Sequence, residues 1–307
     1  MKKQSSSFSV NERNKTGDDA INPHSSMHIK KPDWLKIKLG ETERFTQTKK
    51  IVESHGLHTI CSSGRCPNMG ECWDRGTATF MIGGDICTRS CKFCNTRTGR
   101  PLALDPAEPE NVAQSVKLMK LRHVVITSVD RDDLPDLGAE HWVKTIEAVR
   151  EENPHTTIEI LVPDFQAKEE LIDKVCAAQP NVMAHNMETV RRLTPQIRSA
   201  AKYDVSLKTL ARIAENGILS KSGIMVGLGE TRDEIYELMD DLLAVGCRSL
   251  TIGQYLQPSR KHYPVREYIH PHTFDEFREV ALGKGFHTVV SGPLVRSSYH
   301  ADIYFRP

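Results

Sequence analysis

Residues 78–94 of the chain read ATFMIGGDICTRSCKFC, a short apolar run followed closely by three cysteines. The run ATFMI is continuously apolar, as expected for a strand of a parallel sheet that is buried on both faces. The cysteines Cys87, Cys91 and Cys94 have the spacing C-x3-C-x2-C. Thiolates are soft metal ligands, and this spacing lets one loop wrap a metal centre. The stretch therefore predicts a parallel strand with a metal-binding loop at its carboxyl end.

After this stretch, short apolar runs alternate with longer amphipathic ones. The apolar runs predict further strands at 123–127, 157–162, 182–185, 223–226 and 250–253. The amphipathic runs predict helices near 107–120, 139–152, 166–178, 206–216, 231–245 and 273–284. Repeated strand-then-helix units form a parallel sheet, either closed or open. Polar residues follow each strand, and in α/β barrels the carboxyl ends of the strands build the active site. We therefore predict an α/β fold whose active site includes the cysteine loop.

A second cysteine triplet, Cys61-x4-Cys66-x5-Cys72, precedes the first predicted strand. Three ligands leave a metal centre one ligand short, and the open position can hold substrate or cofactor. The spacing favours iron–sulfur clusters over zinc, because zinc sites usually pair two C-x2-C knuckles. A structural Cys3His zinc site that uses a histidine such as His58 is the alternative. We do not expect disulfides, because a chain of 307 residues has no need of them and begins with no apolar signal segment.

Charge and composition bear on the partners and the cellular location of the protein. The formal net charge is +1, which predicts no nucleic-acid partner. No apolar run approaches the roughly 18 residues of a membrane span, so we expect no membrane association. Free cysteines without a signal segment predict a cytoplasmic protein. Cys176 and Cys247 stand apart from both triplets and are expected to be buried core thiols.

Both triplets carry a resemblance to a known family. The segment CTRSCKFC at 87–94 matches the cysteine loop of the radical S-adenosylmethionine (radical SAM) enzymes, including the aromatic residue before the last cysteine. Within that superfamily the chain resembles the lipoyl synthase family. The matching segments are KPDWL (31–35), CPNMGECW (66–73), VVITSVDRDDLP (124–135), KSGIMVGLGET (221–231), GQYLQPS (253–259) and SGPLVRSSYHAD (291–302). The resemblance thus covers nearly the whole chain.

The resemblance implies a partial (βα)6 TIM-like barrel with extensions at both ends. It divides the chain into an N-terminal extension at 29–76 that carries the first triplet, a radical SAM barrel at 77–285, and a C-terminal extension at 286–307 that carries the RSSY segment. The polar composition of residues 1–28 predicts a disordered tail.

The resemblance also implies two [4Fe–4S] clusters and S-adenosylmethionine as cofactors. One cluster would bind S-adenosylmethionine at an open iron and cleave it to a 5′-deoxyadenosyl radical; its ligands would be Cys87, Cys91 and Cys94. The auxiliary cluster would donate sulfur; its ligands would be Cys61, Cys66, Cys72 and, from the RSSY segment, Ser298.

Contacts to S-adenosylmethionine are expected after the predicted strands. Asn186 and Glu188, two residues apart, suit the ribose hydroxyls. Asp130 is expected to receive the methionine ammonium, although Arg131 beside it offers a local ion pair as the alternative.

Two further sets of residues have weaker predicted roles. Gly227 and Gly229 would let the backbone approach the adenine, although the segment lacks the third glycine of a nicotinamide-binding motif. Arg198 and Lys208 are candidates to hold a carboxylate or the carrier surface, but exposure to solvent is the expectation for both.

The implied reaction inserts two sulfur atoms, at C6 and C8 of an octanoyl chain linked to a carrier lysine, and gives lipoyl-lysine. S-adenosylmethionine would be cleaved to 5′-deoxyadenosine and methionine. The implied partners are octanoylated lipoyl domains of 2-oxoacid dehydrogenase E2 subunits, the glycine-cleavage H protein, and a ferredoxin or flavodoxin as reductant. One alternative is a biotin-synthase-like sulfur insertion on another substrate. A second is a zinc- or cluster-bearing sensor or scaffold with no catalytic activity.

Overall fold

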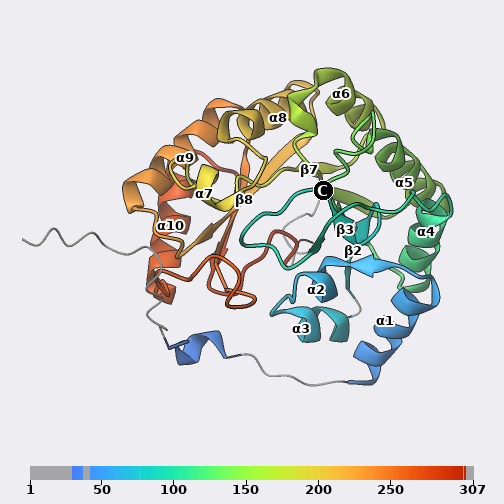
Figure 1. Ribbon diagram of the computed structural model, residues 1–307, viewed down its shortest axis with the longest axis horizontal. Coiled ribbons are helices and arrows are strands. Elements are labelled where there is room, and N and C mark those ends of the chain that lie inside the picture. Colours follow the sequence, from blue (N-terminus) through green and yellow to red (C-terminus); the bar gives the residue numbers. More distant parts are fainter. Residues whose placement is uncertain (1–29, 37–41, 76, 300, 302–307) are drawn as a thin grey trace, which may run out of the picture.

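A computed structural model describes residues 30–36, 42–75, 77–299 and 301. Its centre is a curved eight-stranded sheet in the order β1-β2-β5-β6-β7-β8-β9-β10, with helices around its outer face (Figure 1). All neighbours from β2 to β10 pair in parallel, and β1 pairs with β2 antiparallel. The strands are β1 His58–Thr59, β2 Thr79–Ile82, β5 His123–Ser128, β6 Thr157–Leu161, β7 Val182–Ala184, β8 Leu219–Val226, β9 Ser249–Gln254 and β10 Thr288–Gly292.

The helices that cover the sheet correspond to the six amphipathic runs. They are α4 Glu108–Leu118, α5 Ala139–Glu152, α6 Glu169–Ala177, α8 Tyr203–Glu215, α9 Arg232–Ala244 and α10 Pro271–Lys284. Each buries one face, and the strands between them are buried almost throughout, as in a sheet covered on both faces. The start of α9 is fixed by a capping box between Thr231 and Glu234. This arrangement is the predicted partial TIM-like barrel.

The structure adds elements that local pattern did not predict. A seventh parallel strand, β10, follows α10 and pairs with β9. The side chains of β10 are mostly half-buried, and the strand lacks the long apolar run that is typical of a central strand. The predicted helix at 166–178 begins only at Glu169, because residues 165–167 form a 3-10 turn with positive φ angles. The remaining additions are α1 Glu43–Ser54, α2 Ile60–Ser63, α3 Met69–Asp74, α7 Thr194–Ile197 and the paired short strands β3 Ile86–Cys87 and β4 Arg97–Thr98.

The N-terminal extension packs on the start of β2 through a small apolar cluster. Phe45 of α1 and Trp73 of α3 lie with their ring centroids 5.2 Å apart, and Cys61 and Ala78 complete the cluster. Cys176 and Cys247 are buried in the two larger cores, as predicted. Residues 1–28 and Asp302 lie outside the described residues, and the division into four segments stays a prediction. No described helix combines the length and the apolar character needed to cross a membrane.

Candidate metal-cluster site

One pocket joins the first cysteine triplet to a serine from the other end of the chain. Cys61 lies on α2, Cys72 on α3 and Cys66 between these helices, and all three line the pocket together with Ser298. Ser298 arrives from the segment after β10, and its hydroxyl accepts a 2.8 Å hydrogen bond from Thr79 Oγ1 at the start of β2. The structure therefore collects around one pocket the four residues predicted to hold the auxiliary cluster.

The three thiols of this pocket have raised pKa values. Burial raises the pKa of Cys61 to about 11 and that of Cys72 to about 12, and it also raises the pKa of Cys66. The backbone N–H of Thr79 acts in the opposite direction at Cys61, because it hydrogen-bonds the sulfur. Donors of this kind commonly surround cluster sulfurs and tune them.

The donor arrangement of this pocket fits a four-iron cluster. A four-iron cube takes one ligand per iron, so its ligands stand around a cavity instead of converging on a point. Three thiols and one hydroxyl lining a common pocket fit that requirement.

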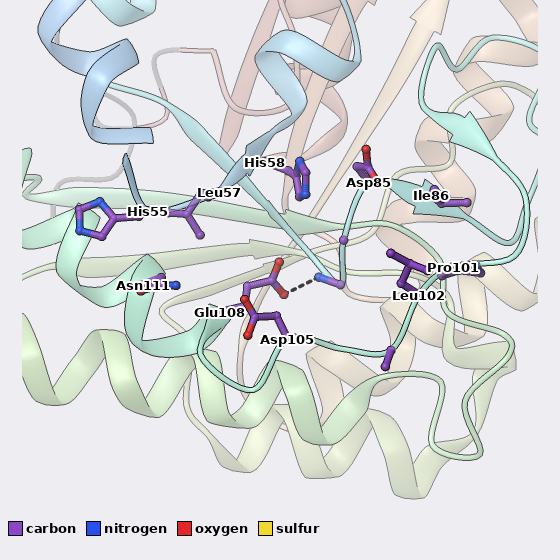
Figure 2. Close-up of a pocket in the computed structure, with 14 residues that line it drawn as sticks. His55, Leu57, His58, Asp85, Ile86, Pro101, Leu102, Asp105, Glu108 and Asn111 are labelled. Atoms are coloured by element: carbon purple, nitrogen blue, oxygen red, sulfur yellow. Dashed lines mark hydrogen bonds between the residues drawn. The ribbon is translucent and has the colours of Figure 1, made fainter. Parts of the chain in front are cut away.

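The histidine of the zinc alternative lies elsewhere. His58 lines a separate pocket of about 170 Å³. Figure 2 shows it there with His55, Asp85 and Glu108. A different histidine, His123, does line the pocket of the first triplet. Its Nδ1 lies 2.8 Å from Thr157 Oγ1, and its Nε2 lies 3.5 Å from Glu159 Oε2, so its ring is held by the neighbouring strand β6.

The second triplet lies in the loop that begins at β3 and is tied to the carboxyl ends of β5 and β6. Cys87 Sγ accepts hydrogen bonds from the backbone N–H groups of Arg89 (3.4 Å) and Asp130 (3.3 Å). Burial raises the pKa of Cys87 to about 12, and it also raises the pKa values of Cys91 and Cys94. The predicted position of this triplet at the carboxyl end of the barrel is thus confirmed.

Arg89, within this loop, makes several ion-pair contacts between the loop and the barrel. Its guanidinium makes paired hydrogen bonds to Asp132 (2.7 and 2.8 Å) and to Asp164 (2.8 Å each), and its Nε lies 3.3 Å from Asp130 Oδ1. Burial would raise the pKa of Asp164, but the hydrogen bonds from Arg89 outweigh it and lower that pKa to about 2. Sequence reasoning missed this role of Arg89, because its three partners lie 41 to 75 residues away.

Asp130 pairs with Arg89 and not with its neighbour. Arg131 instead forms an ion pair with Asp133, with N–O distances of 2.9 Å, and donates to the carbonyl oxygens of Gly83 and Leu102. The local-pair alternative is therefore wrong. Burial raises the pKa of Asp130 while Arg89 opposes that shift. Asp130 lies beside Cys87, which suits its predicted contact with the methionine ammonium; that contact stays a prediction.

Asn186 and Glu188 follow β7 inside the barrel. Glu188 has a φ of 65°, and its backbone pairs with β8 through Gly223 O (3.0 Å) and Met225 N (2.9 Å). Burial raises the pKa of Glu188, while Arg198 and the Asn186 amide oppose the shift. The Asn186 Oδ1 accepts a 3.3 Å hydrogen bond from Ser297 Oγ. The predicted ribose-binding pair therefore lies next to the RSSY segment.

Contacts within the protein explain why position 227 is a glycine. A Cβ atom there would lie 2.3 Å from both Gln254 Nε2 and Glu267 O, and the φ of +94° also favours glycine. Gly229 has a φ of +106°. The approach of this backbone to adenine stays a prediction.

The expectation of surface exposure is confirmed for Lys208 and wrong for Arg198. Arg198 is only 7% exposed, and its Nη1 donates to Ser206 Oγ at 2.8 Å. Its Nε is buried and has no hydrogen-bond partner among the described residues. The cation also influences the pKa values of Cys91 and Glu188. Local sequence pattern carries no signal for this burial, because the partner Ser206 lies on a separate element, α8.

His185, at the end of β7, makes the stability of the fold depend on pH. Its Nδ1 lies 2.9 Å from Val162 O and its Nε2 2.9 Å from Ser206 Oγ, and burial lowers the pKa of His185 from 6.5 to about 4. The unfolded chain therefore takes up this proton at a higher pH than the folded chain, so stability is lost as the pH falls below 6.5. Between pH 7.5 and 5.5 we expect His185 to lower the free energy of unfolding by roughly 1 kcal/mol.

Urea denaturation at both pH values checks this expectation, with His185→Gln as the comparison. The variant should lose that part of the pH dependence. An equal pH dependence in the two proteins would contradict the assignment to His185.

Comparisons with known proteins agree with this geometry. The family model "Radical SAM superfamily" matches residues 81–242. A lipoyl synthase from Parabacteroides distasonis is 68% identical over 277 residues, covering 90% of this chain and 99% of the relative. Lipoyl synthases from Porphyromonas gingivalis and Treponema denticola are 63% and 58% identical, covering 90% and 89% of this chain and 99% and 94% of the relatives.

Solved structures show the same fold at low sequence identity. SuiB from Streptococcus suis, bound to the precursor peptide SuiA, superposes with a TM-score of 0.55 at 12% identity, covering 80% of this chain and 52% of SuiB. The structure of anSMEcpe with bound AdoMet superposes with a TM-score of 0.51 at 11% identity, covering 68% of this chain and 62% of that one.

Proposed function

The chain belongs to the lipoyl synthase family of the radical SAM superfamily, and we propose that its two cysteine triplets hold two separate [4Fe–4S] clusters with different tasks. As a member of that family it is a sulfurtransferase that inserts sulfur into a protein-bound octanoyl group at the expense of S-adenosylmethionine. Membership also implies [4Fe–4S] chemistry. The biotin-synthase-like alternative and the non-catalytic sensor are both set aside by these relatives.

The observation that carries the two-cluster proposal is the shared pocket of the first triplet and Ser298. The second triplet lies apart from it, in the loop tied to the carboxyl ends of β5 and β6. We assign Cys61, Cys66, Cys72 and Ser298 to the auxiliary cluster, and Cys87, Cys91 and Cys94 to the cluster that binds S-adenosylmethionine. Bound there, the clusters supply the electron that cleaves S-adenosylmethionine and the sulfur that is inserted.

The residues around the second triplet offer one complementary group for each polar part of S-adenosylmethionine. Asp130 provides a carboxylate for the ammonium, and Asn186 and Glu188 provide an amide and a carboxyl for the ribose hydroxyls. Arg198 Nε, which is buried without a partner among the described residues, supports a contact to the methionine carboxylate. Gly227 and Gly229 complete the set beside the adenine.

The barrel residues also confine the reaction. The strands that line the interior are buried along most of their length, so a radical formed there is shielded from water. The substrates that we propose are octanoylated lipoyl domains of 2-oxoacid dehydrogenase E2 subunits and the glycine-cleavage H protein. A ferredoxin or flavodoxin is the proposed reductant.

An anaerobic single-turnover assay tests the proposal. The cluster-loaded protein is mixed with S-adenosylmethionine, a reductant and an octanoyl-lysyl peptide, and the peptide is analysed by mass spectrometry. We expect two sulfur atoms in the product. Cys61→Ala should abolish that product while 5′-deoxyadenosine still forms, because only the sulfur donor is removed. Cys176→Ala, at a buried thiol outside both triplets, is the matched control and should keep both products.

Two results would contradict the proposal. Formation of lipoyl peptide by Cys61→Ala at the wild-type yield would remove the first triplet as the sulfur-donor site. Cleavage of S-adenosylmethionine by the wild-type protein without sulfur in the peptide, despite a spectroscopically verified auxiliary cluster, would overturn the substrate assignment.

A further inference from the structure

A buried ion pair inside the barrel ends on the backbone of the RSSY segment. Lys221 on β8 is 5% exposed, and Glu159 on β6 is fully buried. Lys221 Nζ donates to Glu159 Oε1 at 2.6 Å and to the carbonyl oxygen of Ser297 at 2.8 Å. Ser297 directly precedes Ser298, so the ammonium connects the barrel interior to the peptide group beside the proposed cluster ligand.

Stability alone does not account for this ion pair. Removing two charges from water costs several kcal/mol, and well-packed apolar residues of similar size often replace a buried pair without loss. The pair here has a second contact that apolar residues cannot make, because only a hydrogen-bond donor satisfies the Ser297 carbonyl. A specific role for the ion pair therefore depends on the contact between Lys221 and the Ser297 carbonyl.

The RSSY segment depends on such side-chain anchors. Residues 294–299 belong to no helix or strand, so no backbone ladder fixes their position. Asn68 Nδ2 donates to Leu294 O at 2.7 Å, and Thr79 Oγ1 donates to Ser298 Oγ at 2.8 Å. Lys221 bonds Ser297, which lies between Leu294 and Ser298 in the chain. Lys221 is on β8, whereas Thr79 is on β2, so the two anchors come from different strands of the sheet.

We propose that Lys221 is a positioning residue for Ser298. Its ammonium, held by Glu159, fixes the Ser297 carbonyl and so turns the Ser298 hydroxyl toward the pocket of the first cysteine triplet. This inference rests on the proposed function, in which Ser298 completes the auxiliary cluster. Lys221 itself touches neither substrate nor cluster in this scheme.

The test uses the full chain with Cys87, Cys91 and Cys94 replaced by alanine, so that only the auxiliary cluster assembles. The variant pair Lys221→Met with Glu159→Met removes both charges together and leaves no unpaired buried ion. Mössbauer spectra of the ⁵⁷Fe-loaded protein report the iron bound to oxygen. We expect the pair to lose that signature, as Ser298→Ala does, while the melting temperature stays at the starting value.

A second readout uses the same Met pair with all six cluster cysteines present. We expect lipoyl product per turnover to fall by about 10- to 100-fold, the usual effect of removing a group that orients a ligand, while 5′-deoxyadenosine formation is unchanged. The control is Lys284→Met with Asp240→Met, an ion pair between α9 and α10 on the outside of the barrel, which should alter neither readout.

The outcomes separate this inference from the proposed function. If Ser298→Ala leaves the Mössbauer spectrum unchanged, the ligand assignment of the proposed function fails, and the role of Lys221 fails with it. If Ser298→Ala changes the spectrum and the Met pair does not, only the role of Lys221 is overturned. If the Met pair does not fold, Lys221→Leu with Glu159→Leu replaces it, because neither side chain can donate to the Ser297 carbonyl. Failure of both pairs to fold would make the ion pair structural and overturn the inference.

Discussion

Arg89→Met is expected to lower the free energy of unfolding by about 3–5 kcal/mol, the usual cost of removing one partner from a buried ion pair. Arg89 is buried between three carboxylates, and its removal leaves Asp164 and Asp132 without their paired hydrogen bonds. Because Arg89 lies between Cys87 and Cys91, the same change should release the cysteine loop from the barrel. We therefore also expect 5′-deoxyadenosine formation to be lost.

Urea denaturation of the cluster-loaded protein and an assay for 5′-deoxyadenosine measure the two effects. Arg97→Met is the matched control in the same stretch of chain. Arg97 also pairs with an aspartate, Asp85, but its side chain is 68% exposed, so its removal should cost less than about 1 kcal/mol. Equal stability of Arg89→Met and Arg97→Met would show that the buried carboxylates do not depend on Arg89.

Gly253→Ala is expected to displace the RSSY segment and abolish lipoyl formation while leaving S-adenosylmethionine cleavage in place. Gly253 lies on β9, and a Cβ atom there would stand 2.1 Å from the carbonyl oxygen of Val295. The backbone of β9 cannot give way, because Gly253 pairs with both β8 and β10, so the segment at Val295 has to move. We expect a loss of roughly 1–3 kcal/mol in the free energy of unfolding, as for other overpacked sites.

The single-turnover assay and urea denaturation check this prediction as well. Gly283→Ala, in α10, is the control, because a Cβ atom at Gly283 meets nothing within 4 Å. Alanine there should be neutral or stabilise the helix by up to about 1 kcal/mol. Normal lipoyl formation by Gly253→Ala would mean that the segment after β10 need not lie close against β9 for sulfur insertion.

Local sequence pattern was sufficient for the repeated units of the barrel. The strands at 123–128 and 157–161 and the helix at 139–152 appear almost where the apolar periodicity placed them, because each is long enough to show its own pattern. The cysteine spacings likewise identified both candidate metal-binding segments, since each triplet is confined to a few residues. β10 was missed because a half-buried strand next to a turn-rich segment carries only a weak pattern.

Tertiary structure alone decided which distant groups meet. The sequence predicts Arg89 only as part of the cysteine loop and Arg198 as a surface residue, yet both side chains are buried. The meeting of Thr79 with Ser298 spans 219 residues, and that of Lys221 with Glu159 spans 62. Such contacts follow from the curvature and strand order of the sheet, which no local spacing records. The candidate ligands for the clusters and for S-adenosylmethionine can be recognised in the sequence. The side chains that hold these candidates in place depend on the closure of the barrel.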